Sequence, residues 1–256
     1  MKSPLIVLGH ARSGTTLLRA MLNIHEKITM VNEPHLFRSL RSAGIDYQGN
    51  FPAECRADVI EALHQNQRKR LPEEIIQHFS ESTESFTFKD AYESLLPVTE
   101  LNADVNFGEK SPENLRYMDG FYELYPEGFY LHIVRDPRSI ILSKYRKKFH
   151  SGNHVTPSFT WNTITYVISL ALYWRALVSY GRTSLKTKPF DSLQIRYEDL
   201  ITSPEITLKA ICDGLEIEYD ANMENLFSEK REGIRFCFKS RCLACTLNGT
   251  FKEGQG

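Results

Sequence analysis

Five runs of residues along the chain have the apolar, β-branched or aromatic character of short strands. They lie at residues 5–8, 28–31, 105–108, 129–134 and 193–197. Most of these runs are followed by a turn and then by a segment with helical signals. Strands that alternate with helices favour a parallel sheet covered by helices, so the pattern predicts an α/β fold.

Start and stop signals predict where the covering helices lie. Good helix formers open at Thr15 and predict a helix of about 15–25. Ser111 and Ser203 each precede a proline, the pattern of a capped helix start, and the second of these helices should run to 214. Another helix should end near Phe149, and a long one should span about 159–181, with a glycine at its stop. The aromatic and leucine side chains of the long helix are expected in the core: Trp161, Tyr166, Leu170, Tyr173, Trp174 and Leu177.

Residues 38–104 separate two of the strand runs. Helical spacing at 58–70 and 72–79 predicts a mostly helical insertion there, followed by an apolar patch around Phe86 and Phe88. Insertions near the ligand-binding face of a domain usually carry specificity. We therefore expect this insertion to cover a substrate site.

Composition is ordinary for a globular protein. With 256 residues, 41% hydrophobic and 25% charged, the chain should form one domain spanning residues 1–256. Its formal net charge of −1 argues against general nucleic-acid binding. The five cysteines are an odd number and do not make a disulfide scaffold, which favours a reducing compartment.

Neither a leader nor a membrane span is evident in the sequence. The first apolar run is only a few residues long and turns at once into a glycine-containing loop, whereas a signal peptide needs a longer apolar core. The most apolar later stretch, 164–178, contains polar residues and is shorter than the roughly 20 residues of a membrane helix. We expect no membrane span and a cytoplasmic location.

The segment 9–16, Gly-His-Ala-Arg-Ser-Gly-Thr-Thr, lies between the first strand run and the first helix. Strand, glycine-bounded turn and helix form the layout of a phosphate-binding loop, because the first helical turn offers free N–H groups and a positive dipole end. A nucleoside-triphosphate loop has lysine where Thr15 stands, and here Arg12 supplies the charge. A joint whose glycines serve only packing is the alternative. The candidate anion-binding residues are Arg12, Ser13, Gly14, Thr15 and Thr16.

Three charged residues follow the other strand runs. Glu33 follows 28–31, Lys110 follows 105–108 and Arg135 follows 129–134. Because ligands bind at the carboxyl ends of strands in open α/β sheets, these side chains are expected in one crevice with Arg12. Ser143, eight residues after Arg135, is placed to face the same bound phosphate. The alternatives are a loop glutamate, a surface lysine and an Arg135–Asp136 ion pair.

The stretch Arg-Ser-Gly-Thr-Thr-Leu-Leu-Arg-Ala-Met-Leu at 12–22 resembles the 5′-phosphosulfate loop of the sulfotransferases. It is especially similar to the tyrosylprotein sulfotransferases and their bacterial relatives. The resemblance implies a sheet like that of P-loop NTPases, flanked by helices, and 3′-phosphoadenosine 5′-phosphosulfate (PAPS) as the sulfate donor. It covers roughly residues 3–215, with the insertion unmatched.

The resemblance also implies roles for the candidate residues. Arg12 and Lys110 would stabilise the leaving phosphate without a metal, and Glu33 would be the general base for the acceptor hydroxyl. The segment Val-Arg-Asp-Pro-Arg at 134–138 is similar to the family's 3′-phosphate motif, so Arg135 and Ser143 would hold that phosphate. Tyr197 would lie against the adenine, and a buried sheet-end tyrosine is the alternative.

The tail, about 227–256, departs from the family's pattern. A basic loop that closes over the 3′-phosphate is expected there, and the chain has scattered basic residues instead. Possible phosphate contacts are Lys239, Arg241 and Lys252. Cys237, Cys242 and Cys245 have no second pair or histidine nearby and are interpreted as incidental rather than as a redox or metal site.

The sequence thus predicts a PAPS-dependent sulfotransferase. A P-loop kinase that uses ATP and magnesium is the rival, and a nucleotide-binding protein without catalysis is a third class. A tyrosine, a sugar hydroxyl and a small metabolite all remain open as acceptors. The oligomeric state is left open too.

Overall fold

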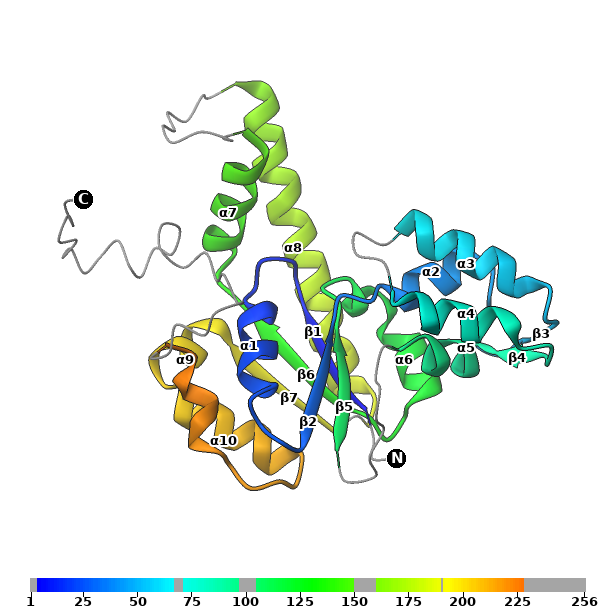
Figure 1. The fold of residues 1–256 in the computed structure, drawn as a ribbon. Coiled ribbons are helices and arrows are strands. Elements are labelled where there is room, and N and C mark those ends of the chain that lie inside the picture. Colours follow the sequence, from blue (N-terminus) through cyan, green and yellow to red (C-terminus); the bar gives the residue numbers. More distant parts are fainter. Residues whose placement is uncertain (1–3, 67–70, 97–104, 150–159, 190, 228–256) are drawn as a thin grey trace, which may run out of the picture.

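The computed structural model describes residues 4–66, 71–96, 105–149, 160–189 and 191–227, and its centre is a sheet of parallel strands (Figure 1). The strands are β1 Leu5–Gly9, β2 Ile28–Asn32, β5 Asn106–Lys110, β6 Phe129–Val134 and β7 Asp191–Arg196. They lie in the order β2-β5-β1-β6-β7, so the first strand of the chain is central and pairs with β5 and β6. The predicted α/β fold with a parallel sheet is confirmed.

The centre of the sheet is buried on both faces, because side chains of β1 alternate between two cores. Leu5 and Val7 pack in one core, and Ile6 and Leu8 pack in the other. The first core is covered by α1 Thr15–Leu22, α9 Tyr197–Thr202, α10 Pro204–Gly214 and the 3-10 helix η2 Ala221–Phe227. The second is covered by the 3-10 helix η1 Asn114–Tyr117, α6 Met118–Leu124, α8 Trp161–Thr187 and the insertion (Figure 1).

The insertion between β2 and β5 is mostly helical, as predicted. It contains α2 Leu36–Ser42, β3 Asn50–Phe51, α3 Cys55–Asn66, α4 Glu73–Glu81, β4 Phe86–Thr87 and α5 Phe88–Leu95. Helices α3 and α4 correspond to the two predicted helical stretches, whereas helices α2 and α5 and the short antiparallel pair β3–β4 were not predicted individually. The ring centre of Phe37 lies 4.7 Å from the ring centre of Phe88 within the insertion and 4.2 Å from that of Phe121 in α6. The core of the insertion is therefore continuous with the core of the sheet.

Some predicted helix ends are wrong. Helix α1 ends at Leu22, before the predicted position 25, and Ser111 opens a turn and a 3-10 helix, with α-helix only from Met118. Helix α8 passes through Gly181 to Thr187 instead of stopping there. A Cβ on Gly181 would lie 2.7 Å from the side chain of Leu115, so this glycine permits close helix packing rather than a helix stop.

The expected burial of the long helix is only partly observed. Leu177 is buried, but Trp161 is 81% exposed at the first turn of α8. The reason is that the first half of α8, together with α7 Pro137–Phe149, projects away from the sheet (Figure 1). Leu177 lies in the second half of the helix and belongs to the core that covers the sheet.

Among the described residues, no helix combines the length and the hydrophobicity that crossing a bilayer requires. The divergent tail, with its three cysteines and with Lys239, Arg241 and Lys252, lies outside the described residues.

Candidate active site

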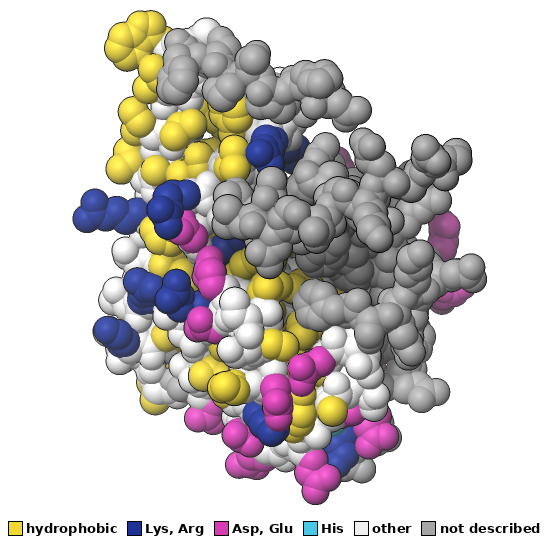
Figure 2. All heavy atoms as spheres, turned by 90° about the vertical axis from the view of Figure 1, so that its left-hand side faces the viewer, with side chains coloured by type: hydrophobic (Ala, Val, Ile, Leu, Met, Phe, Trp, Pro, Cys, Tyr) yellow, Lys and Arg dark blue, Asp and Glu magenta, His cyan; other side chains and the backbone are white. Residues whose placement is uncertain are grey.

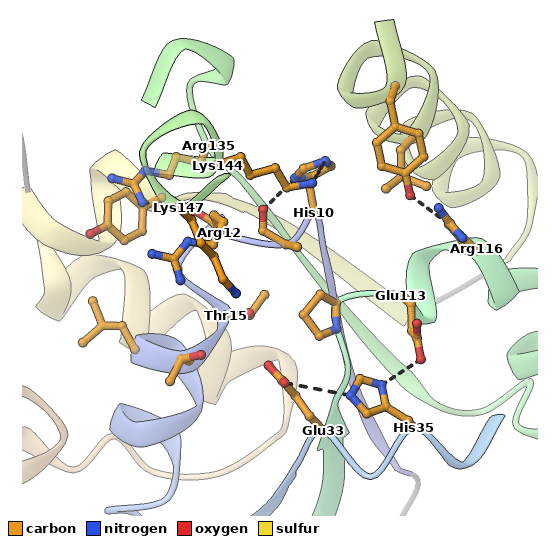
Figure 3. Close-up of a pocket in the computed structure, with 18 of the residues that line it drawn as sticks. His10, Arg12, Thr15, Glu33, His35, Glu113, Arg116, Arg135, Lys144 and Lys147 are labelled. Atoms are coloured by element: carbon orange, nitrogen blue, oxygen red, sulfur yellow. Dashed lines mark hydrogen bonds and ion pairs between the residues drawn. The ribbon is translucent and has the colours of Figure 1, made fainter. Parts of the chain in front are cut away.

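A pocket of about 670 Å³ opens over the carboxyl edge of the sheet (Figure 3). His10 follows β1, Glu33 follows β2, Pro112 follows β5 and Arg135 follows β6, and all four line it. The strand-end residues therefore do meet at one pocket, at the carboxyl edge of the sheet. Seven predicted site residues line the pocket: Arg12, Gly14, Thr15, Thr16, Glu33, Arg135 and Tyr197. Ser13, Lys110 and Ser143 lie beside it rather than on its wall.

The loop between β1 and α1 has the backbone of an anion-binding turn. Arg12 has φ of 79° and Gly14 has φ of 92°, both in the left-handed region, and Gly14 is the N-cap of α1. The N–H groups of the first helical turn have no partner within the helix. The Oγ atom of Ser13 is buried without a hydrogen-bond partner among the described residues. The loop thus presents unpaired donors where an anion can bind.

Arg135 ties this loop to the far edge of the sheet. Its Nη1 donates to the carbonyl oxygen of Arg12 at 3.1 Å, and its guanidinium lies 4.0 Å from the ring centre of Tyr197. Tyr197 in turn packs on Gly14 so closely that a Cβ there would fall 2.1 Å from the ring. The tyrosine is buried at the start of α9, which matches the alternative interpretation of a sheet-end tyrosine. Arg12 Nε donates to Ser143 Oγ at 2.9 Å.

Lys110 and Glu33 form an ion pair at the floor of the site. The Nζ atom of Lys110 lies 2.5 Å from Glu33 Oε1 and donates to Thr16 Oγ1 at 3.3 Å. The lysine side chain is fully buried, whereas that of Glu33 is 38% exposed. Burial lowers the pKa of Lys110, and the bond and charge of Glu33 oppose that shift. Glu33 itself has a left-handed backbone, with φ of 52°.

A histidine that the sequence did not single out lies next to Glu33 (Figure 3). His35 Nδ1 is 2.7 Å from Glu113 Oε1, and His35 Nε2 is 3.9 Å from Glu33 Oε2. Arg38 Nη1 lies 3.5 Å from the other oxygen of Glu113. Burial acts to raise the pKa of Glu113, but the hydrogen bond from His35 and the nearby charges outweigh it and hold that pKa low. The sequence signal was weak, since only the position after a strand end marked His35.

The opposite wall is basic. Arg116 Nε donates to the hydroxyl of Tyr173 at 2.8 Å, and Lys144 Nζ lies 3.5 Å from Nε2 of His10. Burial, and then the charge of Lys144, lower the pKa of His10 to about 4, so His10 is neutral at pH 7. Lys147 also faces the pocket. The pocket wall as a whole has more Lys and Arg than Asp and Glu side chains, which suits an anionic ligand.

No group of three or more His, Cys, Asp or Glu side chains in the described parts of the chain is arranged to hold a metal ion.

The sequence matches one protein-family model and is similar to two known proteins. A family model with the description "Sulfotransferase family" matches residues 4–221. The chain is 22% identical over 217 residues to a "Putative protein-tyrosine sulfotransferase" of Caenorhabditis briggsae, covering 84% of this chain and 66% of that protein. It is 21% identical over 235 residues to an "Uncharacterized protein" of Aquifex aeolicus, covering 90% of this chain and 28% of that protein. The chain therefore spans less than two thirds of the length of each of these two relatives.

Two solved structures share the fold. The sulfotransferase domain of the Synechococcus PCC 7002 olefin synthase has a TM-score of 0.61 at 24% identity, over 90% of this chain and 80% of that domain. The sulfotransferase domain of the curacin biosynthetic pathway has a TM-score of 0.58 at 20% identity, over 87% of this chain and 77% of that domain. At these identities the likeness shows a common fold and leaves donor and acceptor to be argued from the site.

Proposed function

Because this chain belongs to the sulfotransferase family, we propose that it transfers a sulfuryl group from PAPS to an acceptor hydroxyl. The observation that carries the proposal is the convergence of Arg12, Arg135 and the Lys110–Glu33 pair on one pocket. Cations and a carboxylate are the groups that such a transfer needs, for charge stabilisation and for proton removal.

The donor half of the pocket has the unpaired donors that phosphate groups require. Besides Ser13 Oγ, the Nε atom of Arg135 is buried with no hydrogen-bond partner among the described residues. Buried donors of this kind are rare, because each one loses its hydrogen bonds to water. We assign the loop 12–16 to the 5′-phosphosulfate and Arg135, with Ser143, to the 3′-phosphate. PAPS supplies the sulfuryl group, and the chain supplies binding, orientation and proton transfer.

Lys110 links the two halves of the proposed site. Its ammonium group donates to Glu33 and to Thr16, and both of these residues line the pocket. The Thr16 contact holds the ammonium beside the first turn of α1. From this position Lys110 and Arg12 stabilise negative charge on the leaving phosphate as the sulfur–oxygen bond to it breaks.

Glu33 is the proposed general base. Its Oε1 is engaged by Lys110, while Oε2 faces the pocket near His35. As the acceptor oxygen bonds to sulfur, its proton passes to the Glu33 carboxylate. His35, fixed by Glu113, lies beside Oε2 and limits the directions from which an acceptor can approach.

The donor assignment is tested by calorimetric titration of 3′-phosphoadenosine 5′-phosphate and of its analogue without the 3′-phosphate. The unmodified protein should bind the first more tightly than the second. Arg135→Ala should lose about 10- to 100-fold in affinity for the first, the effect of removing a hydrogen bond to a charged group, and little for the second. If the variant keeps the preference, Arg135 does not hold the 3′-phosphate. If the protein bound ATP with magnesium and neither of these two compounds, the result would favour the rival function, a P-loop kinase.

The reaction itself is tested by incubating the protein with PAPS labelled in its sulfate and with panels of tyrosine peptides, sugars and small alcohols. Transfer of label to one panel identifies the acceptor class. Tight binding of the nucleotide without transfer to any panel would favour the nucleotide-binding protein without catalysis.

A further inference from the structure

Exposed apolar side chains gather on the two helices that project from the sheet. Four of them follow one side of α8 at intervals of three or four residues, which places them on one helix face. We call them the α8 stripe: Trp161, Ile164, Ile168 and Leu172, which are 81%, 36%, 53% and 60% exposed. Among the described residues the other large exposed hydrophobics are Phe149 at the end of α7 and Ile206 on α10. The stripe is thus a local feature and not the general character of the surface.

The same two helices have no acidic residue. Helix α7 contains five Lys or Arg residues, helix α8 contains three, and neither contains Asp or Glu. The whole chain nevertheless has a net charge of −1, so the positive charge of these helices is balanced elsewhere. Figure 2 shows yellow hydrophobic and dark-blue basic side chains at the upper left, where the helices project, whereas many magenta acidic ones lie over the lower part.

Basic and apolar groups lie side by side near the free end of the two helices. Phe149 of α7 packs edge-on against Tyr166 of α8, with ring centres 5.4 Å apart. Lys148 Nζ lies 4.1 Å from the ring centre of Tyr166, and Arg146 and Lys147 complete the basic last turn of α7. Tyr166 is two residues, or about half a helical turn, from both Ile164 and Ile168, so Lys148 is level with the stripe along α8 but lies off its face. Arg175 follows Leu172 by three residues, is exposed, and continues the face of the stripe.

We propose that the α8 stripe, with Arg175 on the same helix face, forms a docking surface for a membrane that contains anionic phospholipids. A helix with Trp, Ile and Leu on one face and Lys or Arg beside them binds in the plane of the bilayer interface, where the apolar face enters the acyl boundary. Tryptophan favours the headgroup level, and each basic residue gains from the negative surface potential. The projection of the two helices gives a flat surface room to reach the stripe (Figure 1).

Charge favours a lipid surface over a second copy of this chain. Two copies that met through their stripes would bring Arg175 of both copies to the same interface, and neither copy's α7 or α8 has a carboxylate to offset that charge. An anionic membrane supplies both the apolar layer and the opposite charge. This surface is separate from the proposed reaction, so the test of the docking surface needs no sulfate donor.

The test is binding of the full chain to vesicles of phosphatidylcholine alone and of phosphatidylcholine with about one third phosphatidylserine. Trp174→Phe leaves Trp161 as the only tryptophan, and its fluorescence should shift to shorter wavelength on the anionic vesicles and be quenched by brominated lipid. Binding to neutral vesicles should be much weaker, and salt should reduce binding to the anionic ones.

Two pairs of variants locate the surface. Ile168→Ser with Leu172→Ser should weaken binding to anionic vesicles at least tenfold, and the matched control Ile206→Ser should not change it. Arg175→Glu should weaken it at least fivefold, and the control Lys89→Glu on α5 should not. Circular dichroism and thermal unfolding of each variant show whether it is folded.

Three results would overturn the proposal. One is the absence of binding to either vesicle with an unchanged Trp161 spectrum. Another is binding that the stripe variants do not weaken. The third is a dimer in sedimentation equilibrium, without vesicles, that Ile168→Ser with Leu172→Ser dissociates, because the stripe would then belong to a second copy of the chain.

Discussion

Lys110 shows how much a single residue of the site depends on its neighbours. Its ammonium group is fully buried, and an unpaired buried charge is strongly destabilising. Glu33 compensates that charge, and Thr16 accepts a further hydrogen bond. The same pairing places a carboxylate and an ammonium where the proposed reaction needs a base and a positive charge. The Lys110–Glu33 pair thus serves both the stability of the fold and the proposed reaction.

Glu33→Gln should separate these two contributions. Glutamine can accept a hydrogen bond from Lys110 but cannot take up the acceptor proton, so turnover should fall by about 100- to 10,000-fold. The affinity for 3′-phosphoadenosine 5′-phosphate should remain close to that of the unmodified protein. Steady-state rates and calorimetry on the same preparations test this. The control is Glu113→Gln, which alters the partner of His35 and should slow turnover less than Glu33→Gln does. If Glu113→Gln slowed turnover more, the role of general base would be assigned to the His35–Glu113 pair instead of Glu33.

Arg12→Ala addresses charge stabilisation. Removing one preorganised donor from a site of this kind typically lowers the rate by about 100- to 1,000-fold, and we expect that loss here. The fold should survive, since among the described residues the side chain donates a hydrogen bond only to Ser143, in an exposed contact. Ser143→Ala removes that contact while keeping the guanidinium and is the matched comparison. Turnover that stays unchanged in Arg12→Ala would eliminate the assignment of the loop to the phosphosulfate.

The turn between β1 and α1 decides the geometry of the site at the scale of elements. Gly14 has φ of 92°, and Tyr197 at the start of α9 occupies the space where a side chain would be. Gly14→Ala combines a left-handed backbone with a collision against a ring, so it should destabilise the fold by about 2–4 kcal/mol. Chemical denaturation measures the loss. Gly44→Ala, also at positive φ but with open space around it, should lose only about 1 kcal/mol.

The elements that sequence could predict are those whose signal is local. The strand run 129–134 is apolar because it is buried on both faces, and Pro204 marks the start of α10 directly. The loop 9–16 and the charged strand ends likewise follow from short patterns. The role of Gly181 could not be read in this way, because it depends on Leu115, which is distant in sequence. The contact between His35 and Glu113 could not be predicted either, because it joins two residues that are distant in sequence.

At the scale of the whole molecule, buried ionisable groups link stability to pH. Burial, with Arg182 adding to it, lowers the pKa of the fully buried His132 from 6.5 to about 4. Between about pH 6.5 and pH 4, His132 is therefore protonated in the unfolded chain but neutral in the folded chain. The contribution of the neutral, buried His132 to the free energy of unfolding is thus present above pH 6.5 and is lost as the pH falls toward 4. Glu109 has the opposite effect on the pH dependence of stability. Burial raises its pKa to about 7, so its contribution to the free energy of unfolding falls as the pH rises from about 4.5 to 7.

His132→Gln should therefore flatten the acid side of the stability profile. Between pH 7 and pH 5 the variant should lose about 2 kcal/mol less stability than the unmodified protein does. Urea unfolding at the two pH values, with the midpoint and slope fitted for both proteins, measures the difference. Equal losses in the two proteins would show that His132 does not titrate as its burial implies.

The central position of β1 has a consequence for synthesis on the ribosome. Leu5 pairs with Gly108 and Phe129, so β1 has no partner strand in the sheet until residues more than a hundred positions later have emerged. At about 5–20 residues per second, the apolar segment 5–8 then waits for several seconds or more as an unpaired strand. The intervening insertion can assemble its own aromatic cluster during that time. A nascent chain stalled before β5 has left the exit tunnel should accordingly contain a folded insertion and a segment 5–8 that is open to chaperones and proteases.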